Sequence, residues 1–146
     1  MCYRKNDTHM DLDIDLIKKE NKENPIYYIQ YSFARSQSVL ERSNKAVSSD
    51  MELSFELKNL IKKIHEWDLV ALNSYKRNEV HLIAHYLESV ASMFHSLWSS
   101  AKSNPNSRFL DDENNLTENA QSLLKKYQSV ISEGLGILGI KPKLKM

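Results

Sequence analysis

Apolar residues recur every three or four positions along most of this chain, which is the spacing that places them on one face of an α-helix. The pattern predicts helices over Pro25 to about Asn44, from Leu53 through Ile64, Trp67 to about Tyr75, about Asn78 to Ala101, and Leu116 to Leu138. A polar stretch, Lys18–Glu23, is also interpreted as helical. The predicted fold class is therefore all-α, a helical bundle of about five or six helices.

Several helix ends are marked by residues that suit them. Asn24 followed by Pro25 favours a helix start, because Asn can cap free N–H groups and Pro needs no partner for an N–H. Ser49 and Glu52 have the spacing of a capping box. Gly139 stands where a C-terminal cap is expected. The composition of Lys102–Asn115 predicts a loop.

Composition narrows the class of protein. Only 3 Gly and 3 Pro occur among 146 residues, too few for the frequent turns of an all-β fold. The single Cys excludes an internal disulfide, and no apolar run reaches the about 18 residues of a membrane span. Met1–Asp15 lacks the apolar core of a secretory signal. A net charge of +1 argues against indiscriminate polyanion binding but permits a local nucleic-acid site.

No residue pattern indicates catalysis or metal binding. His81 and His85 share a helix face, but the spacing supplies no third zinc ligand. His95, between apolar positions, is interpreted as a buried or interfacial hydrogen-bonding residue. Cys2 has no nearby base. The acids Asp11, Asp13 and Asp15 alternate with apolar residues, but the Gly and the Glu that a calcium-binding loop requires are absent. A glycine-rich phosphate-binding loop precedes a helix, whereas Gly134, Gly136 and Gly139 lie at the end of one. We expect no catalytic residue and no metal ligand.

Aromatic and basic side chains gather on the helix predicted to begin at Pro25. Tyr27, Tyr28, Tyr31 and Arg35 lie within about two turns, and Tyr31 and Arg35 share a face because they are four residues apart. A ring beside a guanidinium suits an unstacked nucleotide. On these residues alone, ordinary helix packing is the favoured explanation.

The same segment resembles a known family. Residues 24–40, NPIYYIQYSFARSQSVL, are similar to the start of the C-terminal DALR anticodon-binding domain of arginyl-tRNA synthetase, a class I aminoacyl-tRNA synthetase. Residues 4–13 resemble the segment that links the catalytic body to that domain. HLIAHYL (81–87), ASMFHS (91–96), GLGILGI (134–140) and the final Met146 resemble later family segments in the same order. Phe33, Trp98 and Lys143–Lys145 depart from the family pattern.

The resemblance implies a division of the chain and a function. Residues 1–23 would form a linker segment and residues 24–146 the DALR domain, which would bind the anticodon stem-loop of arginine tRNA. The implied tRNA-binding residues are Tyr28, Tyr31, Arg35, Trp98 and Met146. The class I signatures for ATP binding and arginine activation are absent from these 146 residues. We therefore expect a non-catalytic C-terminal fragment without a cofactor of its own.

The remaining expectations concern the parent protein. The resemblance implies an ATP-dependent arginine–tRNA ligase in the cytoplasm, whose catalytic domain would be a partner of this chain, with no membrane association. The alternative on the residues alone is a free-standing helical adaptor that binds other proteins.

Overall fold

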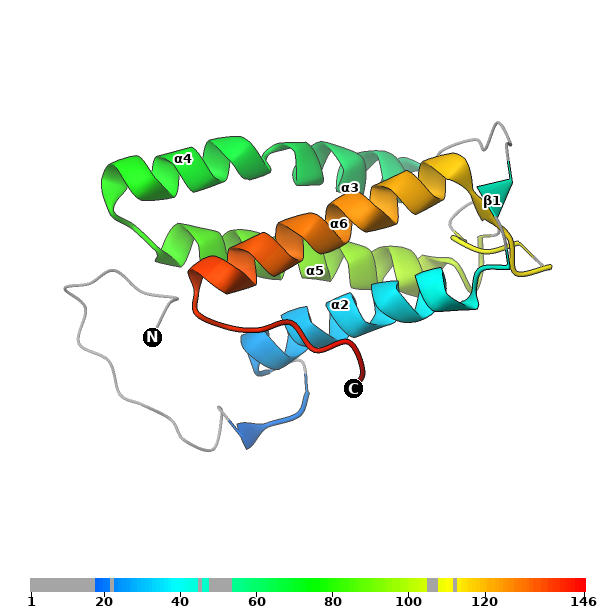
Figure 1. Ribbon diagram of the computed structural model, residues 1–146, viewed down its shortest axis with the longest axis horizontal. Helices are drawn as coiled ribbons and strands as arrows, with labels where there is room; N and C mark the ends of the chain where they lie inside the picture. Colours follow the sequence, from blue (N-terminus) through cyan, green and yellow to red (C-terminus); the bar gives the residue numbers. More distant parts are fainter. Residues whose placement is uncertain (1–17, 22, 45, 48–53, 105–107, 112) are drawn as a thin grey trace.

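A computed structural model describes residues 18–21, 23–44, 46–47, 54–104, 108–111 and 113–146. Within these residues the helices are α2 (Pro25–Arg42), α3 (Phe55–His65), α4 (Trp67–Arg77), α5 (His81–Ser100) and α6 (Glu118–Ile137). Figure 1 shows them packed side by side as a bundle, with α3 and α4 following one another. The predicted all-α class is confirmed. The described helices number five, and only Glu66 separates α3 from α4.

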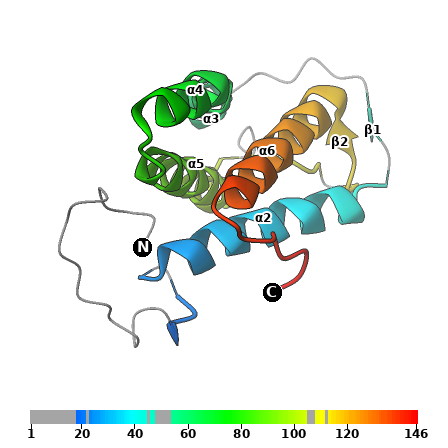
Figure 2. The same cartoon turned by 60° about the vertical axis from the view of Figure 1, so that its left-hand side comes forward.

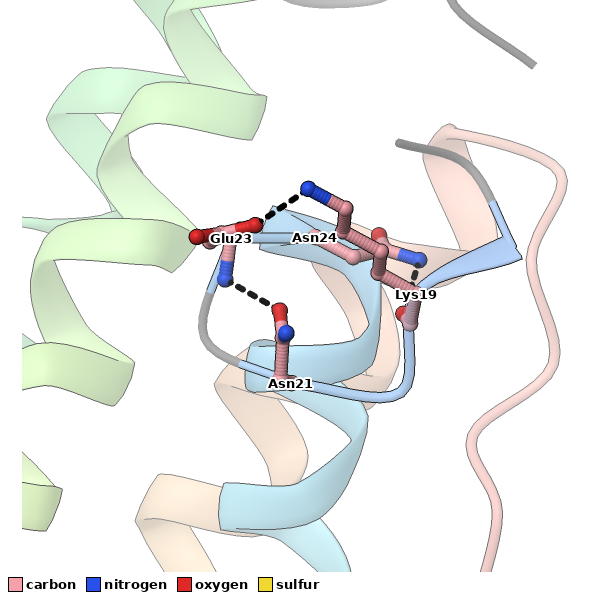
Figure 3. Close-up of polar contacts among 4 residues, drawn as sticks. All are labelled: Lys19, Asn21, Glu23 and Asn24. Carbon is pink, nitrogen blue, oxygen red and sulfur yellow. Dashed lines mark hydrogen bonds and ion pairs between the residues drawn. The ribbon is translucent and has the colours of Figure 1, made fainter. Parts of the chain in front are cut away.

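The start of α2 agrees with the prediction from sequence. The Asn24 Oδ1 atom accepts hydrogen bonds from the backbone N–H groups of Ile26 and Tyr27, and Pro25 occupies the first turn. Figure 3 shows the turn before this helix, where the Asn24 side chain donates to the Lys19 carbonyl and Lys19 pairs with Glu23. Lys19–Asn21 are not helical, so the helical interpretation of that polar stretch is wrong. These side chains form a capping turn instead.

Other helix ends differ from the sequence pattern by a few residues. Ser54 caps α3 by accepting from the Leu57 N–H, whereas Ser49 and Glu52 lie outside the described residues. Asn78 adopts a left-handed conformation (φ 55°) and ends α4, so α5 begins later than predicted.

Gly139 ends α6 as predicted. Its φ of 74° lies in the left-handed region that favours glycine, and the Ile140 N–H returns to the Leu135 carbonyl at 2.8 Å. This Schellman-type cap turns the chain back, and Figures 1 and 2 both show the C-terminal tail running alongside α2.

A short strand pair precedes α6. Leu116–Thr117 (β2) pairs in parallel with Ala46–Val47 (β1), with Ala46 opposite Leu116. Thr117 then caps α6 by accepting from the Ala120 N–H. Leu116 is fully buried, as its apolar character predicts, but in a strand rather than in the helix. The helix therefore starts at Glu118.

Helix α5 forms the centre of the core. It packs against α2, α3, α4 and α6, and in Figure 2 α3 and α4 lie above it and α6 lies beside it. The Phe94 ring of α5 stacks on Tyr127 of α6 with centroids 4.6 Å apart. The buried Tyr127 hydroxyl donates to Ser32 of α2 at 2.6 Å, which joins the three helices and satisfies a polar group inside the core. No helix in the described residues is both long enough and apolar enough to cross a membrane.

Candidate nucleic-acid interface

Side chains of α2 and α5 form an aromatic and basic cluster on one side of the bundle. We call it the Arg35 cluster; it consists of Tyr28, Tyr31, Arg35, His95 and Trp98. The Arg35 guanidinium lies 4.4 Å from the Tyr31 ring centroid and 5.0 Å from that of Trp98. Its Nη2 also donates a hydrogen bond to the Tyr31 hydroxyl at 2.8 Å. The predicted shared face of Tyr31 and Arg35 is confirmed, and Trp98 joins it from α5.

The His95 ring packs against the rings of Tyr28 and Tyr31. Its ring lies 4.3 Å from Tyr28 and 5.7 Å from Tyr31, centroid to centroid, and only 8% of the residue is exposed. The Nε2 atom lies 3.2 Å from the Tyr28 carbonyl oxygen, so Nε2 carries the proton and donates. The interpretation of His95 as a buried hydrogen-bonding residue is confirmed.

Burial also sets the charge of His95. Loss of solvation lowers the pKa of the imidazole below its ordinary value, and the nearby Arg35 charge acts in the same direction. The hydrogen bond to Tyr28 opposes these effects only in part. His95 is therefore neutral at physiological pH, which leaves Arg35 as the cation of the cluster.

The rings of the cluster are held in place before any ligand arrives. Tyr28, Tyr31 and Trp98 are half-buried, and Tyr31 packs between Tyr27 and His95 with centroid distances of 6.2 and 5.7 Å. Tyr31 is thus both a packing residue and a partly accessible ring. Such fixed rings lose little conformational entropy when a base stacks on them.

The Arg35 charge is available to an anionic ligand. No carboxylate among the described residues forms an ion pair with Arg35, whose polar partner is the neutral Tyr31 hydroxyl. Ring faces attract a guanidinium without cancelling its net charge. A phosphate at this position would therefore gain a full positive partner.

A groove of about 400 Å³ adjoins the cluster, with Trp98 among its lining residues. Its lining is mostly apolar and includes two exposed cations, Lys102 and Arg108. The lining residues are Val39, Trp98, Ala101, Lys102, Arg108, Phe109 and Leu110. Apolar walls beside cations suit a base and its phosphate. No local sequence pattern indicates this groove, because its walls come from three separate segments.

The C-terminal tail lies at another edge of α2. Gln30, which is buried, binds the tail backbone at Lys141 and Lys143. Met146 is 46% exposed, and no hydrogen bond or ring contact in the described residues joins it to the Arg35 cluster. The structure thus brings Tyr28, Tyr31, Arg35 and Trp98 together and leaves Met146 outside their direct contacts.

The other candidate motifs do not form sites in the described residues. The His81 and His85 rings lie 6.0 Å apart, and no group of three metal-ligating side chains includes them there. Gly134 is buried against α5, where its missing side chain allows close packing. Cys2, Asp11, Asp13 and Asp15 lie outside the described residues.

Comparisons with known proteins identify the family. The model of the DALR anticodon binding domain matches residues 29–146. The chain is 34% identical to an arginine–tRNA ligase of Roseobacter denitrificans over its whole length, which is 27% of that protein. It is 37% identical to one of Jannaschia sp., over 97% of the chain and 26% of that protein.

A solved structure agrees with these relatives. It is described as an arginyl-tRNA synthetase of Campylobacter jejuni and superposes with a TM-score of 0.81 at 26% identity, over 99% of this chain and 32% of that one. The chain thus spans about a quarter of the length of the curated relatives that it matches. Since the family model covers the chain from Ile29 to its last residue, the chain belongs to the DALR anticodon-binding domain family, and the proteins it resembles over its length are arginine–tRNA ligases.

Proposed function

We propose that this chain binds the anticodon stem-loop of arginine tRNA through the Arg35 cluster and the adjoining groove. The observation that carries the proposal is the Arg35 guanidinium between the Tyr31 and Trp98 rings, with no carboxylate partner among the described residues. Anticodon bases are unstacked in a loop, so they can present both a ring face and a phosphate to such a surface.

Each type of side chain would make a different contact with the RNA. Tyr28, Tyr31 and Trp98 would offer ring faces to bases, and the apolar lining of the groove would accept a further base. Arg35 would donate to a phosphate or a base edge, while Lys102 and Arg108 would neutralise phosphates beside it. Met146 would add a flexible thioether contact from the tail.

The parent protein would be an ATP-dependent arginine–tRNA ligase of the cytoplasm. The relatives that the chain matches support this, since they are arginine–tRNA ligases about four times as long as this chain. Arginine activation and the ATP site would belong to the catalytic domain, a partner of this chain. Binding energy at the anticodon would then orient the distant acceptor end for reaction. The family match supports this module and not the free-standing adaptor.

Filter binding with purified tRNAs tests the proposal. We expect arginine tRNA to bind the chain more tightly than a tRNA for another amino acid, and an isolated arginine anticodon stem-loop to compete for the same site. Equal retention of both tRNAs, or competition by the acceptor arm alone, would contradict it.

A further inference from the structure

Gln30 joins the first half of α2 to the end of the chain. Its Nε2 donates to the Lys141 carbonyl at 2.9 Å, and its Oε1 accepts from the Lys143 N–H at 2.7 Å. Only 5% of the residue is exposed. Both halves of the amide are therefore satisfied by tail backbone, although this side chain lies more than 100 residues away in sequence.

The two hydrogen bonds hold the tail as a neighbouring strand would. They engage a carbonyl and an N–H two residues apart, on either side of Pro142, which has no N–H of its own to satisfy. A hydrocarbon side chain in place of Gln30 would leave a tail carbonyl and an N–H without partners, which costs more than the bonds themselves contribute. Gln30 thus fixes both the position and the direction of the tail.

The tail held in this way lies beside the helix that carries Tyr31 and Arg35. Gln30 precedes Tyr31 by one residue, so it lies about 100° around α2 from that ring, on the neighbouring flank. Figure 1 shows the tail running alongside α2 in the same direction as the helix. From Lys143 the last three residues span at most about 10 Å, whereas Gln30 and Arg35 are about 7.5 Å apart along the helix axis. The tail is therefore long enough to extend along α2 to the level of Arg35, which lies about 140° around the helix from Gln30.

Building on the proposed function, we infer that Gln30 is a positioning residue for tRNA binding. It does not touch the RNA. It holds Lys143, Lys145 and Met146 alongside α2, on the flank next to the one that carries Tyr31, so that their cations and the thioether meet a ligand of the Arg35 cluster without first being ordered. The tail lysines are exposed and would face phosphate.

Limited trypsin digestion tests whether Gln30 holds the tail. Trypsin cuts after Lys143 but poorly after Lys141, because Pro142 follows. We expect Gln30→Met, which keeps the length of the side chain, to speed loss of the last three residues by about tenfold. Gln128→Met is the matched control, since Gln128 binds Ser36 and Gln37 of α2 and not the tail. An unchanged cleavage rate in a folded Gln30→Met chain would overturn the inference.

A binding cycle tests whether the held tail serves the RNA. Affinity for the arginine anticodon stem-loop is measured for the full chain, Gln30→Met, a chain ending at Lys141, and the truncated chain with Gln30→Met. We expect about a fivefold or greater loss for each single change and no further loss for the combination. An equal loss from Gln30→Met in the truncated chain would show that Gln30 acts through folding or direct contact.

The two experiments separate this inference from the proposed function. If the full chain fails to bind arginine tRNA, the proposed function and the RNA role of Gln30 both fall, and the trypsin result still decides whether Gln30 fixes the tail. If the full chain binds and Gln30→Met binds equally well, the proposed function stands and only the positioning role is overturned.

Discussion

Arg35 combines charge with a fixed orientation. The Tyr31 hydroxyl and two ring faces hold the guanidinium in one plane, so a bound phosphate or base edge meets donors that are already aligned. We expect Arg35→Lys to weaken stem-loop binding by about 1 kcal/mol or more, because an ammonium keeps the charge but loses the stacked fork. Arg35→Gln should lose about as much again and flatten the salt dependence by about one unit of slope.

Filter binding across a salt series measures both effects. Arg35→Lys should retain the wild-type slope and Arg35→Gln should not. Wild-type affinity in both variants would exclude Arg35 from the interface.

His95 makes the cluster sensitive to acid. Its pKa is lowered in the folded state, so the unfolded chain binds a proton first as the pH falls. The stability it contributes is therefore complete above an unfolded pKa of about 6.5 and is lost as the pH falls through that value toward the lower folded pKa. We expect the thermal midpoint to fall between about pH 7.5 and about pH 5.5, and His95→Gln to fall less over the same range. Equal falls for both proteins would show that His95 is not the responsible group.

At the scale of the helices, the contact of α5 with α6 depends on one glycine. A Cβ atom at Gly134 would lie 2.6 Å from Leu87 Cδ2 and 3.1 Å from its Cγ, and Leu87 is fully buried. We expect Gly134→Ala to destabilise the fold by about 1–3 kcal/mol through overpacking, reduced by the better helix propensity of Ala. Gly136, two residues on in the same helix, has nothing within 4 Å of such a Cβ. Gly136→Ala should instead stabilise by about 0.5–1 kcal/mol.

Urea unfolding of the two variants measures the difference. The same sign of change in both would show that close packing at Gly134 is not required.

Local features of the sequence were enough to predict most helices and some of their ends. Asn24 with Pro25 and Gly139 act within a single turn, so their roles follow from residue type. The pairing of Leu116 with Ala46 could not be predicted, because strand partners far apart in sequence leave no mark on local spacing.

In the candidate site, too, some contacts follow from local spacing and others depend on the tertiary fold. Tyr31 and Arg35 meet across one helical turn, a relation that their spacing contains. The contact of Trp98 with Arg35 requires two helices to pack in one register, and the bonds of Gln30 to the tail require the chain to turn back after α6. These relations depend on the tertiary fold. The resemblance to the family supplied Trp98, while nothing in the sequence pointed to Gln30.

At the scale of the whole molecule, charge is spread thinly. The net charge is +1, and the cations near the proposed interface are Arg35, Lys102, Arg108 and the tail lysines. We expect stem-loop affinity to fall with salt, but with a slope corresponding to only a few phosphates. Fluorescence anisotropy across a salt titration measures it. Binding that is independent of salt would argue against phosphate contacts altogether.

The proposed interface lies near one end of α5, far from the exposed Tyr75 ring. Trp98 lies near the end of α5, whereas Tyr75 lies near the end of α4, just before α5 begins. Since α5 has 20 residues, these two aromatic side chains are separated by most of its length of about 30 Å. Tyr75 is 85% exposed, which makes it a control for nonspecific stacking.

The assignment of the interface rests most directly on Tyr31. Affinity for the arginine anticodon stem-loop is measured by anisotropy for the wild type, Tyr31→Ala, Tyr31→Phe and Tyr75→Ala, with thermal midpoints recorded for each. Because Tyr31 packs on His95, we expect Tyr31→Ala to lower the midpoint somewhat while remaining folded at the assay temperature. Its binding should weaken by about 1–3 kcal/mol, or about 5- to 150-fold in Kd. Tyr31→Phe, which keeps the ring, should bind within a few-fold of wild type, and Tyr75→Ala should bind as wild type does. Wild-type affinity in folded Tyr31→Ala, or a loss confined to Tyr75→Ala, would contradict the placement of the anticodon loop on the Arg35 cluster.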